Sequence, residues 1–203
     1  MKRTWHSSLI AASVISGLAL SIAPLAARPA AQRKVAQKKV TRRPARLMWK
    51  SYKADNKEFY SAEVAALQYL LRRQGFYQGK PDGVFGPRTT QYVKAFQKAK
   101  GLKADGIVGA STYPKLVVTV KKGDKGDAVR AVQTLMRATM GYDDSQLVNP
   151  ALNTDGVFGT ETLKAVKIEQ EQYNLDPIGS TVAQDGVVGP QSWCAFLGGT
   201  IKR

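Results

Sequence analysis

A five-residue motif, Asp-Gly-Val/Ile-Phe/Val-Gly, occurs four times in this chain and constrains its fold more than any other feature. The first two copies begin 23 residues apart and the last two 30 residues apart. The copies are Asp82–Gly86, Asp105–Gly109, Asp155–Gly159 and Asp185–Gly189. A Val-x-x-x-Gln segment precedes each pair, at Val64–Gln68 and Val129–Gln133. Because self-similarity of this kind marks a repeated structural unit, we expect a duplicated unit.

Each unit is expected to consist of three helices joined by two similar turns. Val64 and Leu67 recur at helical spacing, which predicts an amphipathic helix that begins near Ser61 and ends at Gly75. At each turn, glycine accommodates a positive φ angle and aspartate bonds a nearby backbone N–H. Gly86-Pro87 is typical of a helix start, because proline at the first helical position loses no hydrogen bond.

The second unit follows the same order as the first, with two insertions. One lies between Val129 and Asp155, and the other lies around Asp176–Gln184. Both fall between helices, where added length costs little. In the first unit, Pro114 is expected to limit the third helix to one or two turns.

The first 27 residues have the organisation of an export signal. Lys2 and Arg3 precede the apolar run Leu9–Ala27, which ends in small residues. This order is typical of a secretory signal peptide, with cleavage somewhere within Ala26–Ala31. The alternative is an uncleaved membrane anchor, because the run of 19 residues nearly spans a bilayer. We expect an exported protein.

Positive charge is concentrated in Arg28–Lys57. The chain has a net charge of +16, and this stretch holds eleven basic residues and one acidic residue, Asp55. Its first part lacks apolar periodicity, so we expect a disordered basic linker. Anionic polymers of the cell envelope are the favoured partners of this linker, and no nucleic acid is expected. A solvated spacer without a dedicated partner is the alternative.

Histidine and cysteine are nearly absent. His6 lies in the signal region, and Cys194 is the only cysteine. Once the signal is removed, neither a Ser-His-Asp or Cys-His site nor a histidine-based zinc site can be assembled. We therefore expect no cofactor and no metal. Cys194 is interpreted as a small buried apolar residue, with an intermolecular disulfide as the alternative.

Further segments complete the pattern of the first unit. Gly75-Phe76-Tyr77 precedes the first turn, and Val93-x-x-Phe96-Gln97 and Gly101-Leu102 lie between the two turns. This order closely resembles the peptidoglycan-binding domain found beside bacterial cell-wall hydrolases, over nearly all of Glu63–Leu116. The second unit resembles the same domain over Lys122–Leu197, with Glu169 where the first unit has Phe96.

The resemblance implies an all-α fold with two small three-helix bundles in tandem after the linker. We expect a signal peptide at 1–27, the basic linker at 28–57, a first unit at 58–120 and a second unit at 121–203. The resemblance also implies binding to peptidoglycan in a shallow groove beside the turns. Together with the signal pattern of residues 1–27, it leads us to expect a secreted, cell-wall-associated protein. Whether the second unit binds glycan or only packs against the first stays open.

The candidate ligand contacts are aromatic, cationic and turn residues. Aromatic rings can lie against sugars, and helix N-termini attract carboxylates. The candidates are Tyr77, Asp82, Phe85, Arg88, Tyr92, Asp105, Tyr113, Tyr142, Asp155, Phe158, Asp185 and Trp193. Structural roles compete with ligand contact, because phenylalanine is usually buried and aspartate before glycine forms turns. Trp193 fits either role.

An enzyme is the competing class of function. A carboxylate-based lytic enzyme needs no histidine, but the two units occupy most of the foldable length. Glu161, Glu169 and Glu171 are interpreted as surface charges. We therefore expect a non-catalytic peptidoglycan-binding protein. The alternatives are a cell-wall hydrolase, an accessory subunit of one, and a structural adaptor anchored through the basic tail.

Overall fold

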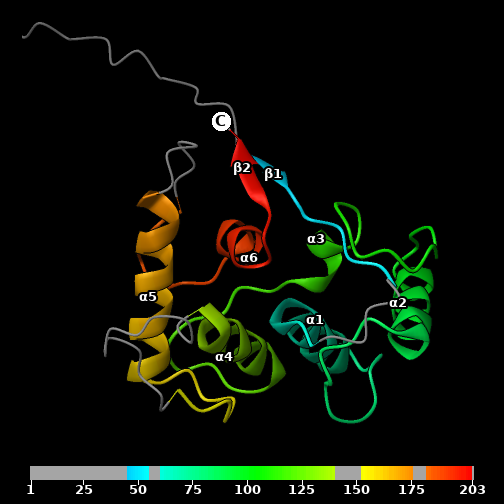
Figure 1. Ribbon diagram of the computed structural model, residues 1–203, viewed down its shortest axis with the longest axis horizontal. Coiled ribbons are helices and arrows are strands. Elements are labelled where there is room, and N and C mark those ends of the chain that lie inside the picture. Colours follow the sequence, from blue (N-terminus) through cyan, green and yellow to red (C-terminus); the bar gives the residue numbers. More distant parts are fainter. Residues whose placement is uncertain (1–44, 55–59, 140–151, 176–181, 203) are drawn as a thin grey trace, which may run out of the picture. The chain divides into compact units, whose positions relative to one another are not determined.

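The computed structural model describes residues 45–54, 60–139, 152–175 and 182–202 (Figure 1). All of these ranges lie in one compact unit, residues 42–203. The expected signal peptide, the linker up to residue 44 and most of both insertions lie outside the described residues. None of the helices within the described ranges has the length and apolar character needed to cross a bilayer.

The described residues are mostly helical, as expected. The helices are α1 (Ala62–Arg73), α2 (Pro87–Ala99), α3 (Tyr113–Leu116), α4 (Asp127–Thr139), α5 (Thr160–Leu175) and α6 (Pro190–Phe196). The strands are β1 (Arg46–Met48) and β2 (Thr200–Lys202). Helices α1 to α3 belong to the first unit and α4 to α6 to the second, whereas the strand pair departs from the all-α expectation.

The helix starts predicted from the sequence are confirmed. The Ser61 hydroxyl oxygen accepts a hydrogen bond from the Val64 N–H at 3.3 Å and caps α1. Gly86 and Gly189 are the N-caps of α2 and α6, and a proline follows each. After α1, Gly75 turns the chain with a φ of 79°, a conformation that favours glycine.

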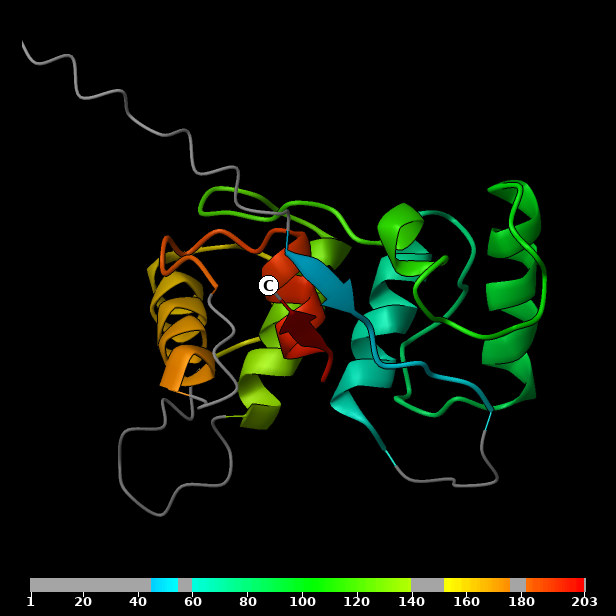
Figure 2. The same cartoon turned by 90° about the horizontal axis from the view of Figure 1, so that it is seen from above.

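One hydrophobic core runs through both units. Helix α1 packs along α4 (Figures 1 and 2), and Leu67 and Val132 are fully buried members of the same cluster. The Trp193 indole of α6 donates to the Val118 carbonyl at 2.6 Å. The second unit therefore packs against the first.

Residues 45–54, which we call the strap, are ordered, although we expected them to belong to a disordered linker. Strand β1 pairs antiparallel with β2, with Leu47 opposite Ile201. Tyr52 then exchanges two backbone hydrogen bonds with Val108, at 3.0 and 2.8 Å, and its hydroxyl donates to the Leu197 carbonyl at 3.2 Å. The strap thus contacts both units.

The strap also contributes a ring to the first unit. Trp49 stacks on Tyr113 with ring centroids 4.3 Å apart. The residues that the strap contacts lie far along the sequence, so the basic composition of residues 28–57 gives no sign of these contacts. A short strand gains its stability from pairing and packing rather than from its own composition.

Candidate functional site

A buried glutamine holds the first Asp-Gly turn. The Gln68 side-chain nitrogen donates to Asp82 Oδ1 at 2.6 Å, and Gln68 Oε1 accepts the backbone N–H groups of Asp82 and Gly83 at 2.9 Å. Asp82 Oδ1 also accepts the Val84 N–H at 2.9 Å. Asp82 therefore forms the turn, although the residue as a whole is exposed.

The same arrangement recurs at the other three turns. Gln97, Gln133 and Gln170 take the place of Gln68, and each Oε1 accepts the N–H of the turn glycine. The glutamine nitrogens also lie within hydrogen-bond distance of a hydroxyl, from Thr89, Thr112, Thr162 and Ser192 in turn. The signal is present in the sequence, because Val-x-x-x-Gln precedes all four turns and the hydroxyl residue follows each aspartate by seven positions.

These hydrogen bonds favour the ionised aspartates. At Asp105 and Asp155 the pKa is lowered, first by the backbone N–H of Ile107 and Val157 and then by the glutamine side chains. In both residues, Oδ1 accepts hydrogen bonds from the turn N–H and from the glutamine side chain. The turn-forming interpretation of the aspartates agrees with this geometry.

Five of the aromatic candidates lie in the core. The exposed fraction is 4% for Tyr77 and Phe85, 1% for Phe158, and 0% for Tyr113 and Trp193. In this structure these rings pack against protein, so a ligand contact through them has almost no accessible surface. The remaining aromatic candidate of the second unit, Tyr142, lies outside the described residues.

The structure brings three of the candidates together beside α2. Arg88 Nε donates to the Tyr92 hydroxyl at 3.2 Å, and the Tyr92 ring meets the Tyr77 ring edge-on at 5.0 Å. Glu161 occupies the position of Arg88 in the second unit and pairs with Lys164 at 3.0 Å. The second unit therefore carries the opposite charge at this position.

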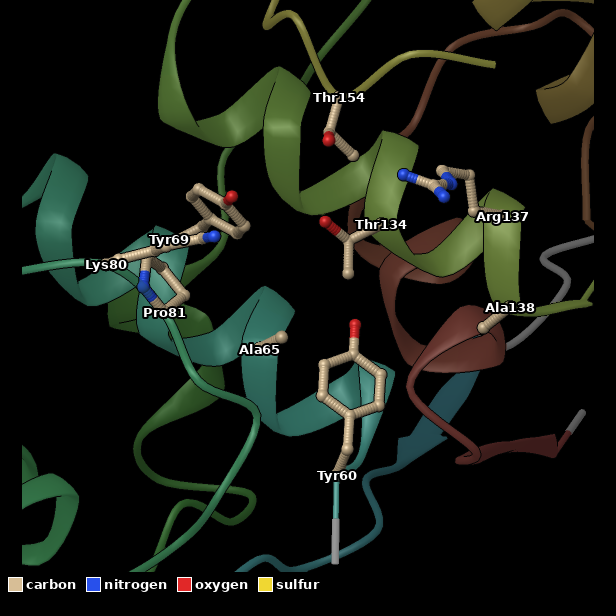
Figure 3. Close-up of a pocket in the computed structure, with 9 residues that line it drawn as sticks. All are labelled: Tyr60, Ala65, Tyr69, Lys80, Pro81, Thr134, Arg137, Ala138 and Thr154. Atoms are coloured by element: carbon tan, nitrogen blue, oxygen red, sulfur yellow. The ribbon is translucent and has the colours of Figure 1, made fainter. Parts of the chain in front are cut away.

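A cavity of about 490 Å³ lies between α1 and α4 (Figure 3). None of the residues that line it is among the candidates from the sequence. They are Tyr60, Ala65, Tyr69, Lys80, Pro81, Thr134, Arg137, Ala138 and Thr154. Both units contribute side chains, so no local sequence pattern reveals the cavity.

The lining combines aromatic faces with positive charge. The Tyr60 hydroxyl points toward Thr134, and Tyr69 and Arg137 lie on opposite sides of the cavity (Figure 3). Of the described residues that line it, Lys80 and Arg137 are cationic and none is acidic. Aromatic rings suit contact with sugars, and cations bind carboxylates through charge-assisted hydrogen bonds. The cavity is therefore suited to an acidic sugar or glycopeptide.

Tyr60 is held in place by the first turn. The Tyr60 ring lies directly against Gly83, where a Cβ would clash with it. Gly83 also has a φ of 72°, which disfavours other residues. The first turn thus lies directly against one wall of the cavity.

Two further sequence-based interpretations concern titratable residues. Cys194 is buried, and burial raises the pKa of its thiol to about 11, which agrees with an unreactive core residue. Glu169, interpreted as a surface charge, is instead half-buried, and burial raises its pKa. Within the described ranges, no cluster of histidine, cysteine, aspartate and glutamate could hold a metal ion.

Known proteins share this sequence pattern. Residues 60–116 match the model of the family described as "Putative peptidoglycan binding domain". A "Probable N-acetylmuramoyl-L-alanine amidase" of Bacillus licheniformis is 32% identical over 163 residues, which covers 70% of this chain and 44% of the relative. A "Spore cortex-lytic enzyme" of Bacillus cereus is 42% identical over 72 residues, which covers 36% of this chain and 27% of the relative. The "N-acetylmuramoyl-L-alanine amidase CwlL" of Bacillus licheniformis is 30% identical over 145 residues, which covers 58% of this chain and 40% of the relative.

These names correct the expectation of a non-catalytic protein. The relatives are named as amidases and a lytic enzyme, so the expectation that the protein is not an enzyme is wrong. It relied on residue counts and foldable length within this chain, which spans less than half the length of these relatives. The relatives also point to an extracellular or cell-wall location. The chain carries a peptidoglycan-binding domain at residues 60–116 and is related to bacterial cell-wall hydrolases.

Proposed function

We propose that this protein takes part in the hydrolysis of bacterial cell-wall peptidoglycan, and that its two units bind the wall. The family match over residues 60–116 carries this proposal. The hydrolytic activity is proposed from the relatives' names, and amide bonds are the substrate class that the amidase names indicate.

The second unit is proposed to be a diverged second copy of the domain. Gln133 and Gln170 repeat the hydrogen bonds that Gln68 and Gln97 make to the turn glycines. The alignment with the Bacillus licheniformis relative covers 70% of this chain, more than the first unit alone supplies. We place the contact with peptidoglycan at the cavity between α1 and α4, to which both units contribute.

Export and wall attachment complete the proposal. We propose that residues 1–27 direct secretion and that the basic residues between 28 and 44 add contacts to anionic envelope polymers. Such contacts are weakened by salt, whereas contacts of sugars with the tyrosine rings of the cavity are less sensitive.

Co-sedimentation of the full chain with purified sacculi, at low and high salt, tests this proposal. We expect pelleting that persists at high salt, together with release of soluble muropeptides or new amino groups from the wall. Pelleting that disappears at high salt would move the attachment to the basic residues. Pelleting without release would contradict the hydrolytic part alone.

A further inference from the structure

We infer that the cavity between α1 and α4 is a carboxylate-binding site of peptidoglycan recognition, and that Arg137 is the residue that receives the carboxylate. The inference rests on the proposed function, because it names the chemical group bound at the surface where we place the wall contact. It follows from comparing equivalent positions of α1 and α4.

Arg72 and Arg137 are equivalent residues of the two units. Each lies four positions after the turn-holding glutamine of its helix, Gln68 in α1 and Gln133 in α4. Arg72 reaches the first turn of α4, where its Nε and Nη2 donate to the two carboxylate oxygens of Asp127 at 2.8 and 2.7 Å. One arginine of the pair is therefore neutralised by a bidentate ion pair.

The corresponding carboxylate for Arg137 is missing from α1. Asp127 lies six positions before Gln133, and the residue six positions before Gln68 is Ala62. The next residue, Glu63, accepts the Ser61 hydroxyl at 2.6 Å. Among the described residues, the ion pairs of α1 and α4 join Asp127 to Arg72 and Arg130, and none includes Arg137.

Within the part of the chain that the structure describes, a cavity lies beside Arg137 and no carboxylate forms an ion pair with it. The cavity volume of about 490 Å³ falls within the usual range of ligand pockets, roughly 300–1,000 Å³. Lys80 supplies a second positive charge from the loop before the first turn (Figure 3). A ligand carboxylate would thus complete the charge pairing that Asp127 provides at the equivalent position.

The two tyrosines supply surfaces for the uncharged part of the ligand. The Arg72 guanidinium lies over the Tyr69 ring at 4.9 Å, which fixes one ring through a cation–π contact. Tyr60 is 65% exposed and rests on Gly83. Two tyrosine rings beside two cations suit a sugar that bears a carboxylate.

Peptidoglycan offers this group in two places. Acidic and terminal residues of the peptide carry carboxylates. A second carboxylate forms on the lactyl group of muramic acid when water hydrolyses its amide bond to the peptide: the C–N bond breaks, the carbonyl carbon gains the water oxygen, and the released amine takes a proton. The same cation chemistry serves both, so the experiment must separate them.

Calorimetric titration of the full chain with three soluble probes makes this separation. The probes are the disaccharide of N-acetylglucosamine and N-acetylmuramic acid, the same disaccharide bearing its peptide, and di-N-acetylchitobiose, which lacks a carboxylate. We expect at least one muramic compound to bind about tenfold more tightly than chitobiose, because a charge-assisted hydrogen bond supplies about that factor. The tighter muramic compound identifies the source.

Arg137→Gln is expected to remove this preference, and Arg137→Lys to retain part of it. Arg73→Gln is the matched control, because it removes an exposed charge of α1 that does not line the cavity. The inference is overturned if no muramic compound binds the wild-type chain, or if Arg137→Gln binds as tightly as the Arg73→Gln control. If the wild-type chain still pellets on sacculi in that case, the proposed wall binding stands; loss of pelleting by the wild-type chain overturns the proposed function itself.

Discussion

Replacement of Gln68 by leucine tests how the turns are held. Gln68 is fully buried, and leucine fills a similar volume but offers no polar atom. The N–H groups of Asp82 and Gly83 then lose an acceptor at 2.9 Å. An unsatisfied buried N–H costs about 1–3 kcal/mol. Since water can reach the exposed Asp82 more easily than Gly83, we expect Gln68→Leu to lower the free energy of unfolding by about 2–4 kcal/mol.

Urea unfolding followed by circular dichroism and tryptophan fluorescence measures this loss. Gln74→Leu is the matched control, because Gln74 follows the last residue of α1 and its side chain makes only long hydrogen bonds, donated to the Lys115 carbonyl at 3.4 Å and accepted from Lys100 Nζ at 3.3 Å. We expect the control to change stability by less than about 0.5 kcal/mol. Gln170 Oε1 accepts one turn N–H, that of Gly186, where Gln68 Oε1 accepts two. Gln170→Leu is therefore expected to lower the free energy of unfolding by less than Gln68→Leu, about 1–2 kcal/mol.

The measured order of these variants decides the argument. If Gln68→Leu is as stable as Gln74→Leu, then water or neighbouring groups satisfy the turn, and the buried glutamines do not hold it. If Gln170→Leu is the most damaging of the three, the number of orphaned N–H groups does not set the cost. Either result would refute the reasoning from hydrogen-bond satisfaction.

The remaining predictions concern charges and the strap. Arg72 lowers the pKa of Asp127, so the ion pair stabilises the fold above the usual carboxyl pKa and loses this effect as the pH falls. Asp127→Asn is therefore expected to lower the urea midpoint at pH 7. The decrease is expected to be much smaller near pH 3, because carboxylates protonate below about pH 4. Burial raises the pKa of Glu169, so its ionised form opposes folding as the pH rises above the ordinary carboxyl range. Glu169→Gln is therefore expected to raise the urea midpoint above that of the wild type by more at pH 7 than at pH 4. An equal increase at both pH values would contradict the burial argument. Trp49→Ala removes the stacking on Tyr113 and is expected to cost about 1–2 kcal/mol, with faster tryptic cleavage at Lys50 and Lys53; cleavage at the wild-type rate would show that the strap does not depend on this ring.

The parts of the fold that the sequence predicts are those whose determinants are neighbours along the chain. The start of α1 depends on Ser61 and the N–H of Val64, three residues later. The starts of α2 and α6 depend on Gly86 and Gly189, each followed by proline. A local pattern is sufficient because each cap bonds within its own turn.

The strap and the cavity depend instead on residues that are distant in sequence. Trp49 meets Tyr113, and Tyr60 shares the cavity with Arg137. A basic segment gives no local sign that strand β2 will pair with it. The sequence also does not tell which aromatic residues are exposed: Tyr113 and Trp193 are in the core, while Tyr60, which the sequence did not single out, lines the cavity.

The contacts between the units bear on the proposed binding of a polymer. Two independent modules on a flexible chain gain avidity through their effective concentration, and each retains its own affinity when they are separated. Here Tyr69 comes from α1 and Arg137 from α4, so separation of the units would dismantle the cavity without altering any residue that lines it. The strap pairs with β2 and with Val108, so it contacts both units, although none of its residues lines the cavity. If the proposed binding takes place at the cavity, loss of the strap contacts is expected to weaken it.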